Sequence, residues 1–498
     1  MDGFSLEQSQ QLFDSLKIDI DTVPLDELAA YSAVVYFLTL EDLPSESASN
    51  LEKAHRHLRA FEHLRDIPDW HRALQVLVIN PDSQMDEELH HLLGIWGYYP
   101  EQAEIYHSLL HKVNADCDTT CLNGLGNFYD IIGNRTRASE YHQQHLRLAR
   151  KISDSAGEWI ALVGLGNIAQ TEGNFSQAAN YFEKGLKIAQ ELKDVQGQAA
   201  LLGSLGSVFV SLQKYAQAKS YGKQSFELAK EHNLLSFQGR AALVLTSVYK
   251  ALREKTEEKD YAQKAWEWCQ QALEVAESIS DRETIARAMQ FLGDIYEDEE
   301  KSVEAIGYHQ KGLEIAREIG DRNIEGECLR GLGNAHNVLE NYQEAIFYFE
   351  QRLQVAEASQ DNIGKRDALK GLSYACDASD RVAEAIIWER KRVKVAKEIK
   401  DWESVASALS YLGYAYLNLE EYKAAERSLL AALLIQEKQG DLKGQVFTFC
   451  NLATLYKDKG ERELALNACE VGLALAQEAN PDLVEVFLEL QRLLVGRC

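Results

Sequence analysis

Apolar residues recur along this chain at a spacing of 40 positions. Nine leucines, each followed by glycine or another small residue, stand 40 residues apart except for one interval of 47: Leu125, Leu165, Leu205, Leu245, Leu292, Leu332, Leu372, Leu412 and Leu452. Outside the copy with the long interval, an alanine follows 13 residues later and an apolar residue 21 residues later. A chance pattern does not keep its register over so many intervals, so the chain is predicted to be a tandem repeat.

Within one copy, the apolar positions follow helical spacing on both sides of a short polar break. Gly333 leaves room for another helix to approach Leu332, and Glu340-Asn341 turns the chain. A second apolar face then follows at Ala345, Tyr348, Phe349 and Leu353. Such a helical hairpin cannot bury its apolar face alone and must stack on its neighbours, which predicts an all-α solenoid.

The boundaries between copies carry their own signals. Gly320-Asp321 and Gly440-Asp441 are each predicted to end one helix with a left-handed glycine and to cap the next helix with the aspartate. The seven extra residues fall near 251–261, where the run Glu254–Asp260 is strongly charged and predicts a solvated helix extension or loop.

The two ends of the chain depart from the repeat. We expect a helical cap over 1–80, with helices at 25–40 and 47–64, and a degenerate hairpin over 81–115. Nine tandem repeats over 116–480 and a C-terminal capping helix over 481–498 would follow, since terminal repeats are commonly atypical. An independent N-terminal domain over the first 80 residues is the alternative.

The repeat resembles a known family. The pattern Leu-Gly-x-x-Tyr, then Ala, Tyr and Leu-x-x-Ala, is similar to the tetratricopeptide repeat (TPR) in its 40-residue form, and Leu-Gly-Asn occurs at 125–127, 165–167 and 332–334. The chain is thereby similar to the Leu-Gly-Asn-repeat (Pins-type) adaptors, to kinesin light chains and to the TPR sensor arrays of bacterial signalling ATPases. This resemblance implies a right-handed TPR superhelix, an α-solenoid whose first helices line a concave groove that holds peptides.

The resemblance also implies which residues face that groove. Carried onto this chain, the family's groove positions give a candidate peptide-binding set of Asn123, Asn127, Asn167, Arg287, Arg330, Asn334, Asn337, Lys370, Tyr374 and Tyr414. Side-chain amides can bond an extended peptide backbone through both donor and acceptor, and arginine or lysine can bind carboxylates. The trio Asp294, Glu297 and Asp298 would add a patch of the opposite sign, so we expect a ligand of acidic or mixed charge. The alternative is that these are ordinary polar residues of a solvated face.

The charge and cysteine content of the chain limit which kinds of partner and environment we expect. There are 52 Lys+Arg against 78 Asp+Glu, giving a net charge of −26, which disfavours nucleic acid and anionic membranes as partners. No signal peptide or membrane-spanning run is recognisable, and the 8 cysteines are too sparse for a disulfide scaffold. We therefore expect a cytoplasmic chain in which Cys117 and Cys121 are buried free thiols.

No residue set predicts catalysis. Phosphate-loop, nucleophile-elbow and zinc-protease motifs are absent from the sequence, so we expect no enzyme activity, no cofactor and no metal. The pairs His107/His111 and His142/His145 are interpreted as exposed histidines rather than metal ligands. The expected function is a non-catalytic protein- or peptide-binding scaffold. The alternative is a sensor or regulatory subunit of a bacterial signalling or defence module whose effector is a separate chain.

Overall fold

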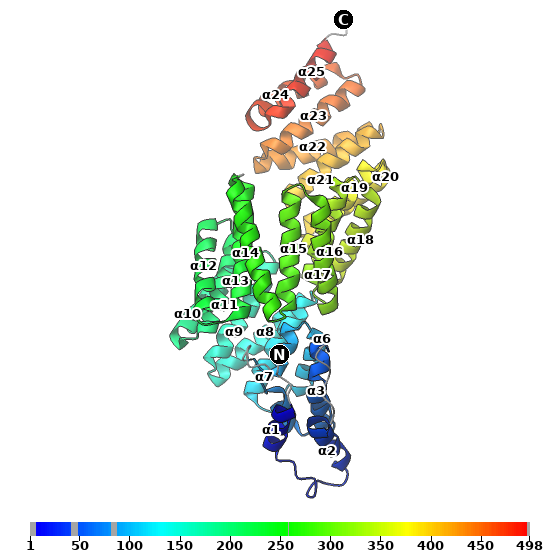
Figure 1. Ribbon diagram of the computed structural model, residues 1–498. Coiled ribbons are helices and arrows are strands. Elements are labelled where there is room, and N and C mark those ends of the chain that lie inside the picture. Colours follow the sequence, from blue (N-terminus) through cyan, green and yellow to red (C-terminus); the bar gives the residue numbers. More distant parts are fainter. Residues whose placement is uncertain (1–5, 41–47, 81–86, 257, 496–498) are drawn as a thin grey trace. The chain divides into compact units, whose positions relative to one another are not determined.

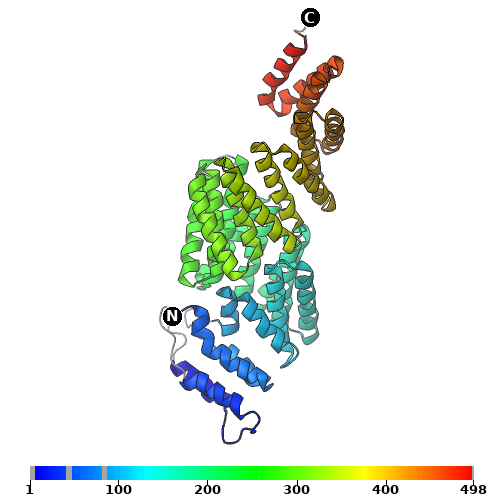
Figure 2. The same ribbon diagram turned by 90° about the vertical axis from the view of Figure 1, so that its right-hand side faces the viewer.

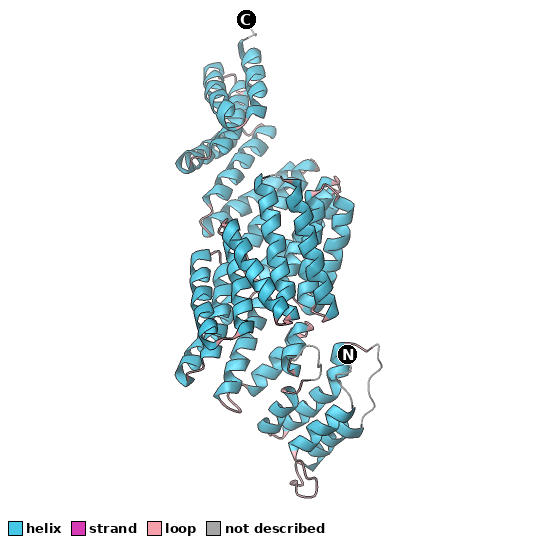
Figure 3. Ribbon diagram, turned by 60° about the vertical axis from the view of Figure 1, so that its left-hand side comes forward, coloured by secondary structure: helices cyan, strands magenta, loops and turns pink. Residues whose placement is uncertain are grey.

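The computed structural model describes residues 6–40, 48–80, 87–256 and 258–495, and every regular element in these ranges is a helix (Figures 1 and 3). Within the same ranges, no helix is long and apolar enough to cross a bilayer. The contacts divide the chain into two compact units, Met1–Cys328 and Leu329–Cys498.

The first unit begins with helices that do not follow the repeat. They are α1 (Leu6–Leu16), α2 (Leu28–Val35) with a π-helical turn over Tyr36–Leu40, α3 (Asn50–Asp66), α4 (Trp70–Leu77), α5 (Leu89–Ile95) and α6 (Tyr99–Leu109). Figure 2 shows these helices in blue, beside the first repeats of the same unit. Ser49 and Glu52 form a reciprocal capping box at the start of α3, so this helix begins three residues after its predicted start at position 47.

Paired helices follow. In the first unit they are α7 (Ala115–Ile131), α8 (Arg135–Ile152), α9 (Ser155–Thr171), α10 (Phe175–Leu192), α11 (Val195–Ser211), α12 (Tyr215–Glu231), α13 (Leu235–Thr256), α14 (Lys259–Ser278), α15 (Arg282–Asp298) and α16 (Ser302–Ile319). Helix α17 (Arg322–Val338) contains the division between the units. The second unit continues with α18 (Tyr342–Ala358), α19 (Asn362–Ala378), α20 (Val382–Glu398), α21 (Trp402–Asn418), α22 (Tyr422–Gln439), α23 (Leu442–Asp458), α24 (Arg462–Ala479), a 3-10 turn over Pro481–Leu483 and α25 (Val484–Val495).

An aspartate starts the first helix of most hairpins. The side chain of Asp194 accepts the backbone N–H of Gly197 at 2.9 Å, and Asp441 accepts that of Gly444 at 2.9 Å. Gly320 and Gly440, which precede two of these capping aspartates, have φ of 74° and 69°. Both predicted boundaries are therefore confirmed: a left-handed glycine closes one helix and the aspartate caps the next.

Small residues let the two helices of a hairpin touch. A Cβ on Gly333 would lie 2.7 Å from the ring of Phe349, which is 1% exposed, and Gly166 faces Phe182 in the same way. The apolar positions of the repeat thus pair a glycine in the first helix with a large side chain in the second. In these two hairpins the pairing forms part of the core.

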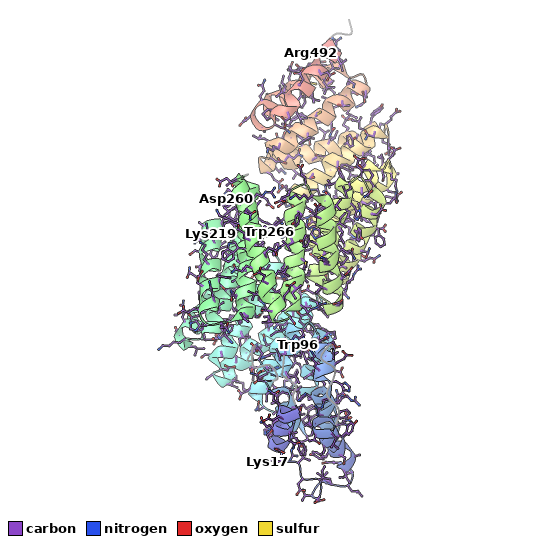
Figure 4. The ribbon with its side chains drawn as sticks, viewed as in Figure 1. Lys17, Trp96, Lys219, Asp260, Trp266 and Arg492 are labelled. Carbon is purple, nitrogen blue, oxygen red and sulfur yellow. The ribbon has the colours of Figure 1, made fainter. Side chains whose placement is uncertain are left out.

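The seven-residue insertion lengthens one hairpin. Helices α13 and α14 have 22 and 20 residues, whereas the helices of the other repeats have 17 or 18. Figure 4 labels Asp260 near the start of α14 and Trp266 further along the same helix. The insertion therefore extends the hairpin beyond its neighbours.

The polar residues of the core correct one prediction and confirm another. His142 and His145 are 1% and 2% exposed, so they are buried and not on a polar face, although His107 and His111 are exposed as expected. The reason is the register: position 142 is equivalent to the buried Phe182 and Phe349 of later copies. The thiols of Cys117 and Cys121 are free and buried, as predicted.

Candidate ligand-binding groove

Four first helices of successive repeats line one cavity in the first unit. Its volume is about 490 Å³, and α9, α11, α13 and α15 contribute most of its wall. These helices lie side by side in Figure 1. Because the cavity faces the first helices, it lies on the side of the repeats that the TPR resemblance assigned to a groove.

The wall formed by α11 is made of small residues. Ala200, Gly203, Ser204 and Ser207 follow one another at helical spacing along this wall. A Cβ on Gly203 would meet only the hydroxyl of Ser225, at 3.3 Å. The small side chains at these positions of α11 leave space that the neighbouring helices do not fill.

Amides and apolar residues complete the sides of the cavity. On α9, the side-chain amide of Gln170 donates to the hydroxyl of Ser207 at 2.8 Å, and Asn167 lies one turn away. The apolar part comes from Val163, Val210, Val244, Phe237 and Phe291. The cavity therefore offers both hydrogen-bonding groups and apolar surface to a ligand.

Charged residues gather at one end of the cavity. Glu283 lies between two arginines, with Arg240 Nη2 at 3.7 Å and Arg287 Nη2 at 3.4 Å from its carboxylate oxygens. Burial favours the neutral form of Glu283, but attraction to Arg240 and Arg287 outweighs it and lowers the pKa of this carboxyl. The three side chains lie at the cavity wall, and they are ionised at neutral pH.

The start of α6, in the N-terminal region, contacts the charged end of the cavity. Tyr99 Oη donates to Glu283 Oε2 at 3.4 Å, across 184 residues of sequence. Two residues before Tyr99, Gly97 has a φ of 85° and faces Ile319, where any Cβ would collide with that side chain. The start of α6 is thus packed against the α15–α16 hairpin within the first unit, close to the charged end of the cavity.

Two buried aspartates stand behind these arginines. Asp281 and Asp321 are 1% and 2% exposed, and both cap the helix that follows them. Burial raises the pKa of each carboxyl, although Arg240 acts against this on Asp281 and Arg287 on Asp321. They supply negative charge behind the arginines, so the charged end as a whole has both signs.

The acidic trio of α15 is not an open patch for a ligand. Asp294 pairs with Lys250 at 2.8 Å, Glu297 with His309 at 3.0 Å and Asp298 with Arg253 at 3.1 Å. The expectation of a free patch of negative charge is corrected, because Lys250 and Arg253 of α13 and His309 of α16 occupy these carboxylates.

The predicted groove residues fall into two groups. Asn167 and Arg287 line the cavity together, whereas Asn123 and Asn127 lie on α7 outside its wall. The remaining six lie in the second unit: Arg330, Asn334 and Asn337 on α17, Lys370 and Tyr374 on α19, and Tyr414 on α21.

The six residues of the second unit differ in accessibility. Tyr374 is 58% and Tyr414 39% exposed, and Lys370 is exposed as well. Arg330, Asn334 and Asn337 are half-buried. Their role in binding stays a prediction.

Sequence reasoning missed Glu283 and Tyr99. Glu283 stands nine residues before Leu292, one helical turn beyond the groove positions that the resemblance supplied. Extending the same face by one turn would have found it. Nothing in the repeat pattern points to Tyr99, because it lies outside the repeats.

The sequence comparisons agree with the repeat pattern. The tetratricopeptide repeat family model matches residues 118–191, 158–231 and 292–358. These residues are therefore tetratricopeptide repeats, and the described part of the chain folds as an all-α TPR superhelix of helical hairpins. Comparison with curated protein sequences gives no significant match.

Several solved structures have a similar fold. A Rap protein complexed with competence and sporulation factor has 14% identity and a TM-score of 0.47, covering 78% of this chain and 99% of that chain. The TPR sensor protein of the class of signal transduction ATPases with numerous domains, from Pyrococcus horikoshii, has 15% identity and a TM-score of 0.47, covering 90% and 75%. The Cut9–Hcn1 hetero-tetramer of APC/C has 17% identity and a TM-score of 0.46, covering 87% and 84%. At these identities the similarity concerns the fold alone.

Proposed function

We propose that this protein is a non-catalytic scaffold that binds a peptide segment of another protein in the cavity between α9, α11, α13 and α15. The observation that carries the proposal is the cavity itself, about 490 Å³ on the first-helix side of four consecutive repeats. Ligand sites in proteins fall in this range of size and combine apolar walls with a few polar groups.

The wall chemistry suits a polypeptide. Asn167 and Gln170 can each donate to a backbone carbonyl and accept from a backbone N–H. The small residues of α11 leave room for a side chain of the ligand, and Phe237 and Phe291 give it apolar contact. An extended segment therefore has both its backbone and its side chains matched.

The charged end supports a ligand of mixed charge. Arg240 and Arg287 offer donors to a carboxylate, while Glu283 accepts from a basic or amide group. A purely acidic ligand would be repelled by Glu283, whose side chain lines the cavity, so a segment that carries both signs fits better. This refines the expectation of an acidic or mixed ligand from sequence.

The first test uses a random peptide library displayed on phage and selected on the full chain. Enriched peptides are then measured against wild type, Arg287→Ala and Ser204→Trp, in which the indole occupies the cavity. We expect about tenfold or greater loss of affinity in both variants, because interfacial arginine is a frequent hot spot and a filled cavity excludes the ligand.

The matched control is Lys184→Trp, which adds the same side chain at an exposed position of α10 on the outer side. It should bind the peptides like wild type. Equal binding by Ser204→Trp and wild type, equal loss in Lys184→Trp, or failure to enrich any peptide would contradict the proposal.

A further inference from the structure

One buried position in the second helix of the repeats is apolar in several copies and a histidine in α8 and α16. The equivalent residue is Phe182, Phe349 or Leu429 in other copies, each at most 1% exposed. In α16 it is His309, which is 0% exposed. Gly293 makes room for the imidazole, since a Cβ there would lie 2.5 Å from the ring.

Two carboxylates of α15 face this imidazole. His309 Nε2 lies 3.0 Å from Glu297 Oε1 and 3.9 Å from Asp294 Oδ1. The three atoms all lie within 4.8 Å of one another. Asp294 and Glu297 are three residues apart, so one face of α15 presents both groups to α16.

We propose that His309, Asp294 and Glu297 form a binding site for one divalent metal ion of the zinc type. Bonds of about 2.0–2.2 Å to nitrogen and oxygen in a tetrahedral site place neighbouring ligand atoms about 3.3 Å apart. The observed separations need only small side-chain shifts to reach this spacing. Imidazole together with carboxylates is a donor set that zinc accepts, and the fourth position would hold water.

Lys250 is a built-in competitor for this site. Its Nζ lies 2.8 Å from Asp294 Oδ2, the oxygen that does not face His309, and Gln290 Nε2 donates to the same oxygen at 2.5 Å. The ammonium thus neutralises part of the negative charge that would attract a metal ion. Removing Lys250 should therefore tighten metal binding, which an ordinary ion-pair network around His309 would not produce.

The experiment uses the full chain after chelator treatment. Zn²⁺ binding is measured by equilibrium dialysis with metal analysis, and Co²⁺ is used as a second probe because its visible absorption reports tetrahedral coordination. Wild type should bind one equivalent that His309→Leu binds at least tenfold more weakly. Leucine is chosen because Leu429 occupies the equivalent core position.

His142→Leu is the matched control, because His142 is buried at the equivalent position of α8. This variant should still bind one equivalent of Zn²⁺, whereas Lys250→Met should bind the ion at least threefold more tightly than wild type. Metal held by the second cluster, Glu88, His90 and His91, would be unaffected by any of these changes and is subtracted as the common background.

Glu297→Gln, which is nearly isosteric, tests the same site if His309→Leu does not fold. This variant should also lose the equivalent of Zn²⁺ that wild type binds. The proposal is overturned if His309→Leu or Glu297→Gln binds like wild type, or if His142→Leu loses the same equivalent. No gain in affinity in Lys250→Met would equally overturn the role given to that residue. None of these outcomes depends on the peptide ligand of the groove.

Discussion

The imidazoles of His142 and His145 are packed in the core of this protein. Their protonation makes the stability of the fold depend on pH. His142 lies against Gly126 and Gly164, where Cβ atoms would crowd its ring. Burial is the main cause that lowers the pKa of His142 to about 3 and that of His145 to about 4. Both imidazoles are therefore neutral in the folded chain at neutral pH.

The first residue-scale prediction follows from this shift. The unfolded chain protonates His142 below a pKa of about 6.5, while the folded chain does so only near 3. Stability is therefore fully present above pH 6.5 and is lost as the pH falls toward 3, by about 1.4 kcal/mol per pH unit for this one group. At pH 5 the loss is roughly 2 kcal/mol relative to pH 7.

His142→Leu is the comparison that isolates this effect, because all other titrating groups are common to both chains. Urea titrations at pH 7 and pH 5, followed by circular dichroism, should show a smaller loss of stability in the variant by about this amount. An equal loss in both chains would mean that His142 is not protonated on unfolding in this pH range.

The burial of these histidines shows how far the environment of a single side chain can be predicted from the sequence. The spacing of His142 and His145 indicated a shared helical face but not which face. The repeat register contained the answer, since the equivalent positions hold Phe182 and Phe349. By contrast, nothing in a single sequence pairs Asp294 with Lys250, because their contact depends on side-chain geometry between two hairpins.

At the scale of elements, each hairpin is delimited by local backbone chemistry. The capping aspartates satisfy N–H groups that the first turn of a helix leaves without partners. The residue before the cap often has positive φ even when it is not glycine, as at Lys193 (55°) and Lys400 (59°). These features recur at the same place in the repeat, which is why helix boundaries could be predicted from sequence.

A prediction at this scale concerns Asp194, whose carboxylate accepts the N–H of Gly197. Asp194→Ala should destabilise the first unit by about 1 kcal/mol, whereas Asp194→Asn should stay close to wild type because asparagine caps equally well. Denaturant unfolding of the two variants measures the difference. If alanine and asparagine behaved alike, the cap would not be what starts α11.

The sequence alone could not reach the contacts that bring distant segments together. A repeat pattern specifies how each hairpin meets its neighbours. The contact of Tyr99 with Glu283 joins segments 184 residues apart, and it depends on how the whole first unit curves. The TPR fold was thus predictable, while the charged end of the cavity was not.

At the scale of the whole molecule, the ligand site that we propose lies in one part of the chain. The cavity belongs entirely to the first unit. In the second unit the predicted groove residues Tyr374 and Tyr414 remain accessible. The principal ligand site that we propose is therefore the cavity lined by α9, α11, α13 and α15.

Hydrogen exchange of the full chain, with and without a peptide selected as described above, tests this claim most directly. Bound ligand should slow exchange in the first helices α9, α11, α13 and α15, because it suppresses local opening where it binds. The outer helices α10, α12 and α14 should change far less. Protection confined to the outer helices or to the second unit, with none in α9, α11, α13 and α15, would contradict the account.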